Sequence, residues 1–180
     1  METTKPETFS SKNIYKGRIF GVRVDTIREG DINYNREIVV HGGSAVIVPV
    51  FADGSVALVR QYRHPAGKYL LELPAGGLES GEDPKTGATR ELEEEIGVTA
   101  AKIEKLAEFY VSPGFLTEKM FLFLATELTE TSQNLDEDEN IEIQHTTFPQ
   151  AFELIRGGGI EDAKTIAGLT LAGSRFGFSL

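Results

Sequence analysis

The sequence contains no cysteine and no apolar run long enough to cross a membrane. Without cysteine the chain can form no disulfide framework, no zinc–thiolate site and no thiol nucleophile. Residues 1–12 are polar and lack the apolar stretch of a signal peptide. These absences together predict a cytoplasmic protein that does not bind membranes.

Positive charge is also scarce, because 18 lysines and arginines face 28 aspartates and glutamates, which gives a net charge of −10. This argues against nucleic-acid binding, for which a basic surface is expected. An anionic substrate would have to be held by local arginine or lysine side chains and by metal ions. With 180 residues, of which 40% are hydrophobic, the chain can bury the core of one domain with a small appendage.

The most informative stretch runs from residue 76 to residue 98 and predicts a helix. Asp83 can cap the N-terminus, Pro84 suits the first helical position, and Gly97 suits the left-handed position after the last turn. An apolar face for packing is formed by residues at four-residue intervals, namely Ala88, Leu92 and Ile96.

Three carboxylates share another face of this predicted helix. Glu91, Glu94 and Glu95 lie at positions i, i+3 and i+4, a spacing at which like charges destabilise an isolated helix. Their proximity is best explained by a hard divalent cation with oxygen ligands, Mg²⁺ or Mn²⁺. Arg90 would lie among the acids and could orient them. The plain alternative is a solvated acidic face, since charged stripes usually face water.

The spacing around these carboxylates resembles a known signature. Gly76, Glu82 and the run RELEEEIGV at residues 90–98 match, at every specified position, the box of the Nudix hydrolases. The resemblance implies a loop–helix–loop that binds two or three Mg²⁺ ions, with Mn²⁺ as an alternative. It also implies hydrolysis of a nucleoside diphosphate linked to another group. The implied fold is α+β, a mixed sheet sandwiched between helices.

The same resemblance assigns roles to the residues of the box. It makes Glu91 and Glu95 the main metal ligands at the catalytic centre, with Glu94 supporting them or binding a further metal. The backbone carbonyl of Ala75 would complete the set, since a small residue there suits close approach to a ligand. Arg90 belongs to the catalytic group. Glu82 is expected to hold the ligands in place, with direct metal contact as the alternative.

A turn beyond the helix points to one branch of the family. Ser112-Pro113-Gly114 is by composition an ordinary turn. However, Pro113 lies sixteen residues after Gly97, where the ADP-ribose pyrophosphatase branch has a proline, and the segment ending at Glu118 also resembles that branch. Some nucleotide-sugar hydrolases share these features. The resemblance makes Pro113, Gly114 and Glu118 candidates for substrate binding.

The polar loop at residues 129–140 contains a run of acids and by composition is a solvated loop. In the ADP-ribose pyrophosphatases a loop at this place carries a Glu-x-Glu pair. The resemblance therefore implies that Glu137 takes the proton of the attacking water and that Glu139 binds metal. The alternative pairing, shifted along the loop, is Glu139 with Glu142.

The strand ending at Arg63 supplies further candidates for substrate binding. Alternation along the strand places Gln61 and Arg63 on one side, where a guanidinium could pair with a diphosphate in a bidentate manner. This resembles the Gln-x-Arg of the same branch. Arg36, in the N-terminal strands, is a weaker candidate that rests on the resemblance alone.

The N-terminal region predicts three short antiparallel strands, after loosely held residues 1–12. These strands are predicted at Ile14–Phe20, Val22–Arg28 and Tyr34–His41. The sequence thus predicts two parts, N-terminal strands at 1–43 and a Nudix domain at 44–180. The resemblance implies that residues 1–43 serve in a homodimer interface.

Further elements are predicted in the second part of the chain. They are a buried strand at 44–51, a hairpin at Asp53-Gly54 with its partner strand at 55–63, extended segments at 69–74, 101–111, 120–128 and 141–144, and helices at 147–156 and 162–171.

We therefore expect Mg²⁺-dependent hydrolysis of ADP-ribose to AMP and ribose 5-phosphate. A nucleotide-sugar pyrophosphatase, acting for example on GDP-mannose, is the first alternative, because it would need only a different pocket. A non-catalytic nucleotide-binding module is the second, although the complete set of carboxylates argues against it.

Overall fold

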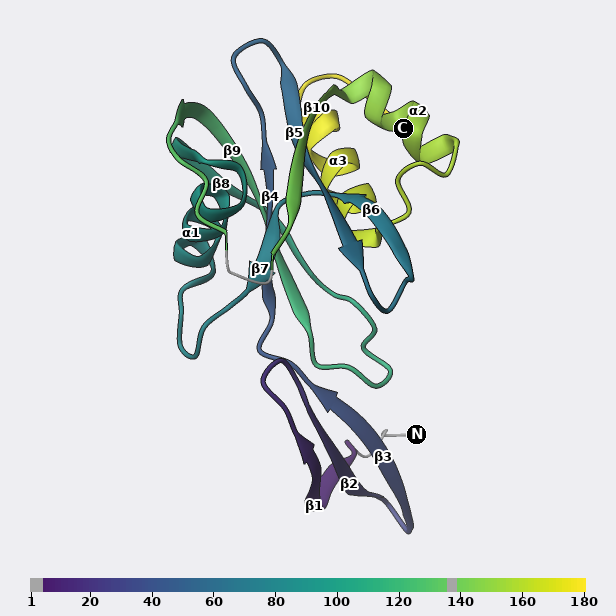
Figure 1. The fold of residues 1–180 in the computed structure, drawn as a ribbon. Helices are drawn as coiled ribbons and strands as arrows, with labels where there is room; N and C mark the ends of the chain where they lie inside the picture. Colours follow the sequence, from purple (N-terminus) through teal and green to yellow (C-terminus); the bar gives the residue numbers. More distant parts are fainter. Residues whose placement is uncertain (1–4, 136–138) are drawn as a thin grey trace. The chain divides into compact units, whose positions relative to one another are not determined.

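The computed structural model describes residues 5–135 and 139–180 and divides into two compact units (Figure 1). The first unit contains the described residues up to Gly43 together with Phe109–Lys119. The second unit contains the described residues of Ser44–Glu108 and Met120–Leu180. The whole box of residues 76–98 lies in the second unit, so the fold of that unit builds the site.

The first unit is an antiparallel sheet whose strands follow chain order. It consists of β1 (Glu7–Lys16), β2 (Gly21–Glu29) and β3 (Ile32–Val40). Gly30 turns the chain between β2 and β3 with φ +59°, a conformation that glycine adopts without strain. The predicted N-terminal antiparallel sheet is confirmed.

The start of this sheet differs from the prediction. Residues 7–12 are not loosely held, because β1 pairs with β2 from Glu7, opposite Arg28, to Lys16, opposite Gly21. Strand pairing uses backbone groups, so a polar segment can join a sheet without an alternating apolar pattern. The predicted strand over residues 14–20 ends early, since the N–H of Gly17 donates to the carbonyl of Phe20 at 2.9 Å.

The second unit contains two sheets. The larger has the order β7-β4-β9-β8 and is formed by β4 (Ser44–Pro49), β7 (Ala75–Gly77), β8 (Val98–Tyr110) and β9 (Lys119–Glu130). It is mixed, because β4 runs parallel to β9 and antiparallel to β7. The smaller is an antiparallel sheet of β10 (Ile141–Thr147), β5 (Ser55–Arg63) and β6 (Lys68–Glu72).

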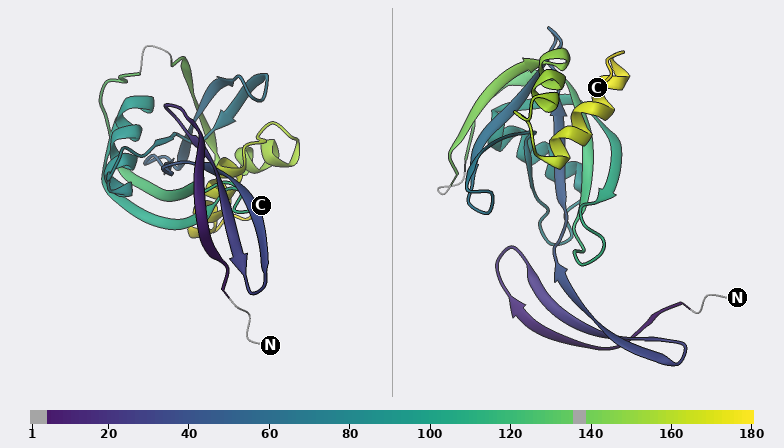
Figure 2. Two further views of the ribbon diagram at one scale, coloured as in Figure 1. Left: turned by 90° about the horizontal axis from the view of Figure 1, so that it is seen from below. Right: turned by 90° about the vertical axis from the view of Figure 1, so that its right-hand side faces the viewer.

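Helices cover both faces of strand β4, as Figures 1 and 2 show. Helix α1 (Pro84–Ile96) packs its Ala88 and Leu92 into a core cluster with Ala45 and Ile47. On the other face, helix α3 (Ala163–Arg175) approaches so closely at Gly168 that a Cβ there would lie 3.3 Å from Val48. The predicted mixed sheet between helices is confirmed.

The remaining helix, α2 (Phe148–Arg156), begins at the predicted capping box. The side chain of Thr147 accepts from the N–H of Gln150, and Gln150 in turn accepts from the N–H of Thr147. None of the helices in the described part of the chain is long and apolar enough to span a bilayer.

Candidate active site

Helix α1 begins and ends where the sequence predicts. Asp83 accepts hydrogen bonds from the N–H groups of Lys85 and Thr86 at 3.0 and 3.2 Å, and Pro84 follows as the first helical residue. Gly97 ends the helix in the left-handed conformation, with φ +63°. These caps fix the register, and the register decides which way each carboxylate points.

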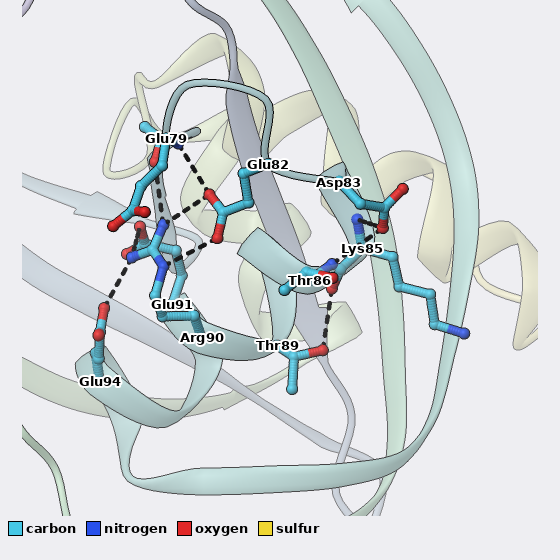
Figure 3. A network of polar contacts seen from close by, with 10 residues as sticks. Glu79, Glu82, Asp83, Lys85, Thr86, Thr89, Arg90, Glu91 and Glu94 are labelled. Carbon is cyan, nitrogen blue, oxygen red and sulfur yellow. Dashed lines mark hydrogen bonds and ion pairs between the residues drawn. The ribbon is translucent and has the colours of Figure 1, made fainter.

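Arg90 lies at the centre of an acidic cluster, as Figure 3 shows. Its Nε donates to Glu82 at 3.2 Å, and its Nη1 donates to Glu91 at 2.7 Å and to Glu94 at 2.9 Å. Its Nη2 donates to Glu82 and to the carbonyl of Gly77. Hydrogen bonds to Glu82, and the charge of Glu91, raise the pKa of Arg90 above its already high value. Arg90 therefore stays charged and orients the acids around it.

Glu91 is held against strand β7. Its side chain lies over Gly76 so closely that a Cβ at Gly76 would be 2.0 Å from the carboxyl carbon. Only glycine leaves room for this approach. Glu91 is 8% exposed, so its carboxylate faces the strand rather than bulk water.

Glu95 is the most buried acid of the box, with 3% of its surface exposed. It accepts a hydrogen bond from the N–H of Ala75 at 2.9 Å. The carbonyl of Ala75, predicted as a metal ligand, therefore belongs to the same short strand that touches both Glu91 and Glu95. The structure thus brings together three of the residues that the sequence singled out.

The electrostatics of this cluster call for a cation. The pKa of Glu95 is raised to about 8, mainly by burial and in addition by the charges of Glu91 and Glu139, although the Ala75 N–H opposes the rise. Burial also raises the pKa of Glu91, although Arg90 opposes this. One guanidinium therefore does not compensate these acids. Their oxygen donors fit a hard divalent cation, which would favour the charged carboxylates.

The protein need not supply all the ligands of such a cation. Among the described residues, no three carboxylate or imidazole groups already lie in a metal-binding cluster. Mg²⁺ usually keeps several waters and binds through one or two carboxylates together with substrate phosphates. The residues present therefore fit a metal that is partly coordinated by water and substrate.

The acidic loop is described only in part. Glu137 lies outside the described residues, so its predicted role is not addressed by the structure. Glu139 lies near enough for its charge to act on Glu91 and Glu95. Glu142, the alternative, is 62% exposed at its side chain and pairs with Arg60 at 3.3 Å. Because Arg60 and Gln61 alternate along β5, this pair lies on the sheet face away from Gln61.

Comparison with known proteins decides the family. A model of the NUDIX domain matches residues 41–169. The chain belongs to the Nudix family. It is 38% identical over 169 residues to the ADP-ribose pyrophosphatase of Bacillus subtilis, which covers 92% of this chain and 91% of that protein. The predictions of the family and of a Nudix hydrolase are confirmed.

Other Nudix relatives carry different names. The chain is 37% identical to the methanol dehydrogenase activator of Bacillus methanolicus, over 89% of this chain and 88% of that protein. It is 35% identical to the GDP-mannose pyrophosphatase of Shigella flexneri, over 78% of this chain and 79% of that protein. The crystal structure of an ADP compounds hydrolase shares the fold, with a TM-score of 0.86 at 22% identity over 98% of this chain and 97% of that one.

Beside the Nudix box, Arg63 already has a protein partner. It forms a bidentate pair with Glu72, in which Nε donates to Oε1 at 2.8 Å and Nη2 donates to Oε2 at 2.9 Å. Gln61 lies two residues earlier on the same face of β5, opposite Ile141 of β10. Substrate binding by Arg63 and Gln61 stays a prediction.

The other predicted substrate residues belong to the first unit. Arg36 lies on β3, with its guanidinium 4.3 Å from the ring centre of Tyr34. The loop that carries Pro113 and Gly114 is fixed to β3, because the N–H of Val39 donates to the carbonyl of Phe115 at 2.8 Å. In the same unit, Glu118 lies 3.7 Å from Nδ1 of His41. Their part in a common site stays a prediction.

In the second unit, sequence reasoning overlooked a buried pair of charged residues. Glu72 is 1% exposed and Lys164 is 9% exposed, and they form an ion pair with each other. A signal for Glu72 was available, since an acid within the apolar strand LLELP faces a buried environment. Lys164 gave no such signal, because lysine in a helix normally faces water.

Proposed function

We propose that this Nudix hydrolase cleaves the pyrophosphate bond of ADP-ribose and releases AMP and ribose 5-phosphate, with Mg²⁺ as cofactor. The observation that carries the proposal is the buried and undercompensated carboxylate pair of Glu91 and Glu95 against strand β7. The choice of ADP-ribose is supported by the Bacillus subtilis relative and by the position of Pro113.

In this proposal two or three metal ions are held by oxygen donors around α1, and Mn²⁺ could replace Mg²⁺. The donors are Glu91, Glu94, Glu95, Glu139 and the carbonyl of Ala75. When bound, the metal would neutralise the diphosphate and stabilise the charge that develops as water attacks phosphorus.

The chain's own residues then orient the metal ligands and accept a proton from the attacking water. Arg90 holds Glu91 and Glu94 in place through its Nη1, and Glu82 holds Arg90 by two hydrogen bonds. Glu137 takes the proton of the attacking water. The pKa of Glu82 is lowered by the hydrogen bonds of Arg90, so Glu82 remains a charged partner rather than a proton donor.

Further residues are proposed to contact the substrate. Arg63 and Gln61 would bind the diphosphate. Arg36, Pro113, Gly114 and Glu118 would contact the rest of the substrate.

A product assay with ADP-ribose and GDP-mannose side by side, at equal concentration and with Mg²⁺, tests this proposal. We expect the higher kcat/KM with ADP-ribose and AMP as a product. A higher kcat/KM with GDP-mannose would favour the alternative that the Shigella flexneri relative supports, and would leave the metal site intact. Binding of metal and nucleotide without turnover of either substrate would favour the non-catalytic module.

We also propose that the protein works as a homodimer in the cytoplasm and binds neither nucleic acid nor membrane. Large apolar side chains are exposed on the N-terminal unit, and a small sheet needs something to pack against. They are Phe9, Ile14, Tyr15, Ile19, Phe20 and Ile32. The absence of cysteine and the net charge of −10 support the remaining points. Sedimentation velocity should give a dimer, and replacing Phe9 and Ile14 by serine should give monomers.

A further inference from the structure

A second cluster of buried charge lies outside the Nudix box. Glu72, at the end of β6, and Lys164, in the first turn of α3, are both buried and paired. Removing such charges from water costs free energy that the pairing must offset. The roles assigned above use neither residue, so the pair needs its own explanation.

Glu72 fixes the guanidinium of Arg63. The bidentate pair uses Nε and Nη2 of Arg63, whereas Nη1 has no hydrogen-bond partner among the described residues. The Arg63 side chain is 37% exposed. One edge of the planar guanidinium is therefore clamped to the protein, and the other edge can meet an anion. Arg63 also lies close enough to Glu95 for their charges to interact.

Lys164 holds the other side of the same carboxylate. Its Nζ donates to Oε2 of Glu72 and lies 3.0 Å from Oδ2 of Asp162, which caps helix α3. A cation is disfavoured at a helix N-terminus, because the helix dipole is positive there. Lys164 therefore lies at a position where the helix dipole favours an acid. The ion pair with Glu72 compensates for this unfavourable interaction of Lys164 with the dipole.

Lys164 also changes what Arg63 presents to a ligand. An isolated arginine–glutamate pair is neutral and attracts an anion weakly. Because Glu72 is shared between Arg63 and Lys164, the acid neutralises Arg63 only in part. Asp162 brings the sum of the four charges to zero, but it pairs with Lys164 and Thr165 and not with Arg63. In a chain of net charge −10, an anion site depends on such local positive charge.

We propose that Lys164 is a positioning residue that acts through Glu72 to orient Arg63 and to preserve its positive charge for the diphosphate of the substrate. The proposal deepens the proposed function and rests on it for the role of Arg63. It does not depend on which group is attached to the nucleoside diphosphate.

The test is a double-mutant cycle on Lys164 and Arg63. Lys164→Met and Lys164→Arg are made in the wild type, and Lys164→Met is also made in an Arg63→Gln background. KM and kcat are measured with ADP-ribose, and the Kd of ADP with Mg²⁺ is measured by calorimetry. Because ADP binding needs no turnover, it tests the proposal even if ADP-ribose proves to be the wrong substrate.

We expect Lys164→Met to raise KM and the ADP Kd about tenfold, the effect of weakening one charge-assisted hydrogen bond. The value of kcat should fall by less than KM rises, and Lys164→Arg should restore binding. In the Arg63→Gln background, Lys164→Met should add no further loss. An equal loss in both backgrounds, or an unchanged ADP Kd, would overturn the proposal.

Lys68→Met is the matched control. Lys68 also joins β6 to the start of α3, by pairing with Glu161, and its removal changes the net charge equally. It is about half exposed, so we expect no change in the ADP Kd. If Lys68→Met weakens binding as much as Lys164→Met does, the effect is one of overall charge and the proposal is wrong.

If Lys164→Met fails to fold, a second variant tests the proposal. Lys164→Met leaves Glu72 with a single partner, so the double variant Glu72→Gln with Lys164→Met removes both buried charges and should fold. Circular dichroism checks the fold. The double variant leaves the charge of Arg63 intact but removes the carboxylate that orients its guanidinium, so the ADP Kd should still rise. Wild-type binding by the folded double variant would overturn the orienting role and with it the proposal.

Discussion

Gly76→Ala offers the sharpest test of the metal site, because it adds one methyl group beside a ligand and changes no charge. The new Cβ would lie 2.0 Å from the carboxyl carbon and Oε1 of Glu91 and 2.2 Å from Oε2. Such contacts essentially never fall below 3.0 Å. The carboxylate must therefore retreat by about 1 Å from the position in which Arg90 holds it.

A displacement of this size is expected to lower the reaction rate. Misplacing a catalytic group by about 1 Å costs about 100-fold in rate, or about 2.7 kcal/mol of activation free energy. We therefore expect kcat for ADP-ribose to fall about 100-fold at saturating substrate and Mg²⁺, with weaker Mg²⁺ binding. The fold should persist, because φ of Gly76 is not in the left-handed region and the core is untouched.

Gly77→Ala is the matched control for this variant. Gly77 is the next residue of β7, and a Cβ there would meet nothing within 4 Å. Its carbonyl would still accept from Arg90, since the backbone is unchanged. If Gly76→Ala keeps a kcat within threefold of that of Gly77→Ala, Glu91 does not act from the position in which the structure holds it, and the metal assignment fails.

Four further substitutions or conditions test separate parts of the molecule. Glu95→Gln should keep the fold, because glutamine is a neutral isostere, but should abolish most turnover; full activity would remove Glu95 from the metal set. Glu137→Gln should lower kcat much more than it changes KM, and an unaltered kcat would place the base elsewhere in the loop. Burial would raise the pKa of Glu72, but hydrogen bonds and charges from Arg63 and Lys164 outweigh this and lower the pKa. The free energy of unfolding, measured by denaturant titration, should therefore fall as the pH drops below about 4.3, the usual pKa of glutamate. Glu72→Gln should lose less of its free energy of unfolding over the same pH interval. Gly97→Ala should lower the free energy of unfolding in urea by about 1–2 kcal/mol, since φ is +63° and the new Cβ would lie 2.8 Å from the backbone nitrogen of Gln133; an unchanged midpoint would contradict this.

The sequence was most informative where function depends on spacing along one element. The caps at Asp83 and Gly97 fix the register of α1, and the register alone places Glu91, Glu94 and Glu95 on one face. Every feature of that inference is local, so no tertiary information was needed. Strand β1 shows the opposite case, because its first residues are polar and only pairing with β2 makes them a strand.

The buried pair of Glu72 and Lys164 could not be predicted because its two members are 92 positions apart in the chain. A sequence pattern can indicate that an acid in an apolar strand is buried, but it cannot identify the cation that pairs with it. That partner depends on where α3 meets the end of β6, and this contact forms only in the folded unit. Lysine at a helix start has no local advantage, so propensity gives no hint either.

The second unit therefore carries two charge clusters of opposite character. Around α1 the buried acids exceed the single guanidinium of Arg90, so this cluster attracts cations. Around Glu72, Arg63 and Lys164 share one carboxylate, and Arg63 keeps one edge of its guanidinium without a protein partner among the described residues, so this cluster can bind an anion. A metal-bound diphosphate satisfies both at once, because its metal suits the first cluster and its phosphate oxygens suit the second. A free phosphate monoester or a metal ion alone would satisfy only one. This pairing explains how a chain with a net charge of −10 could bind a doubly charged anion without any broad basic surface.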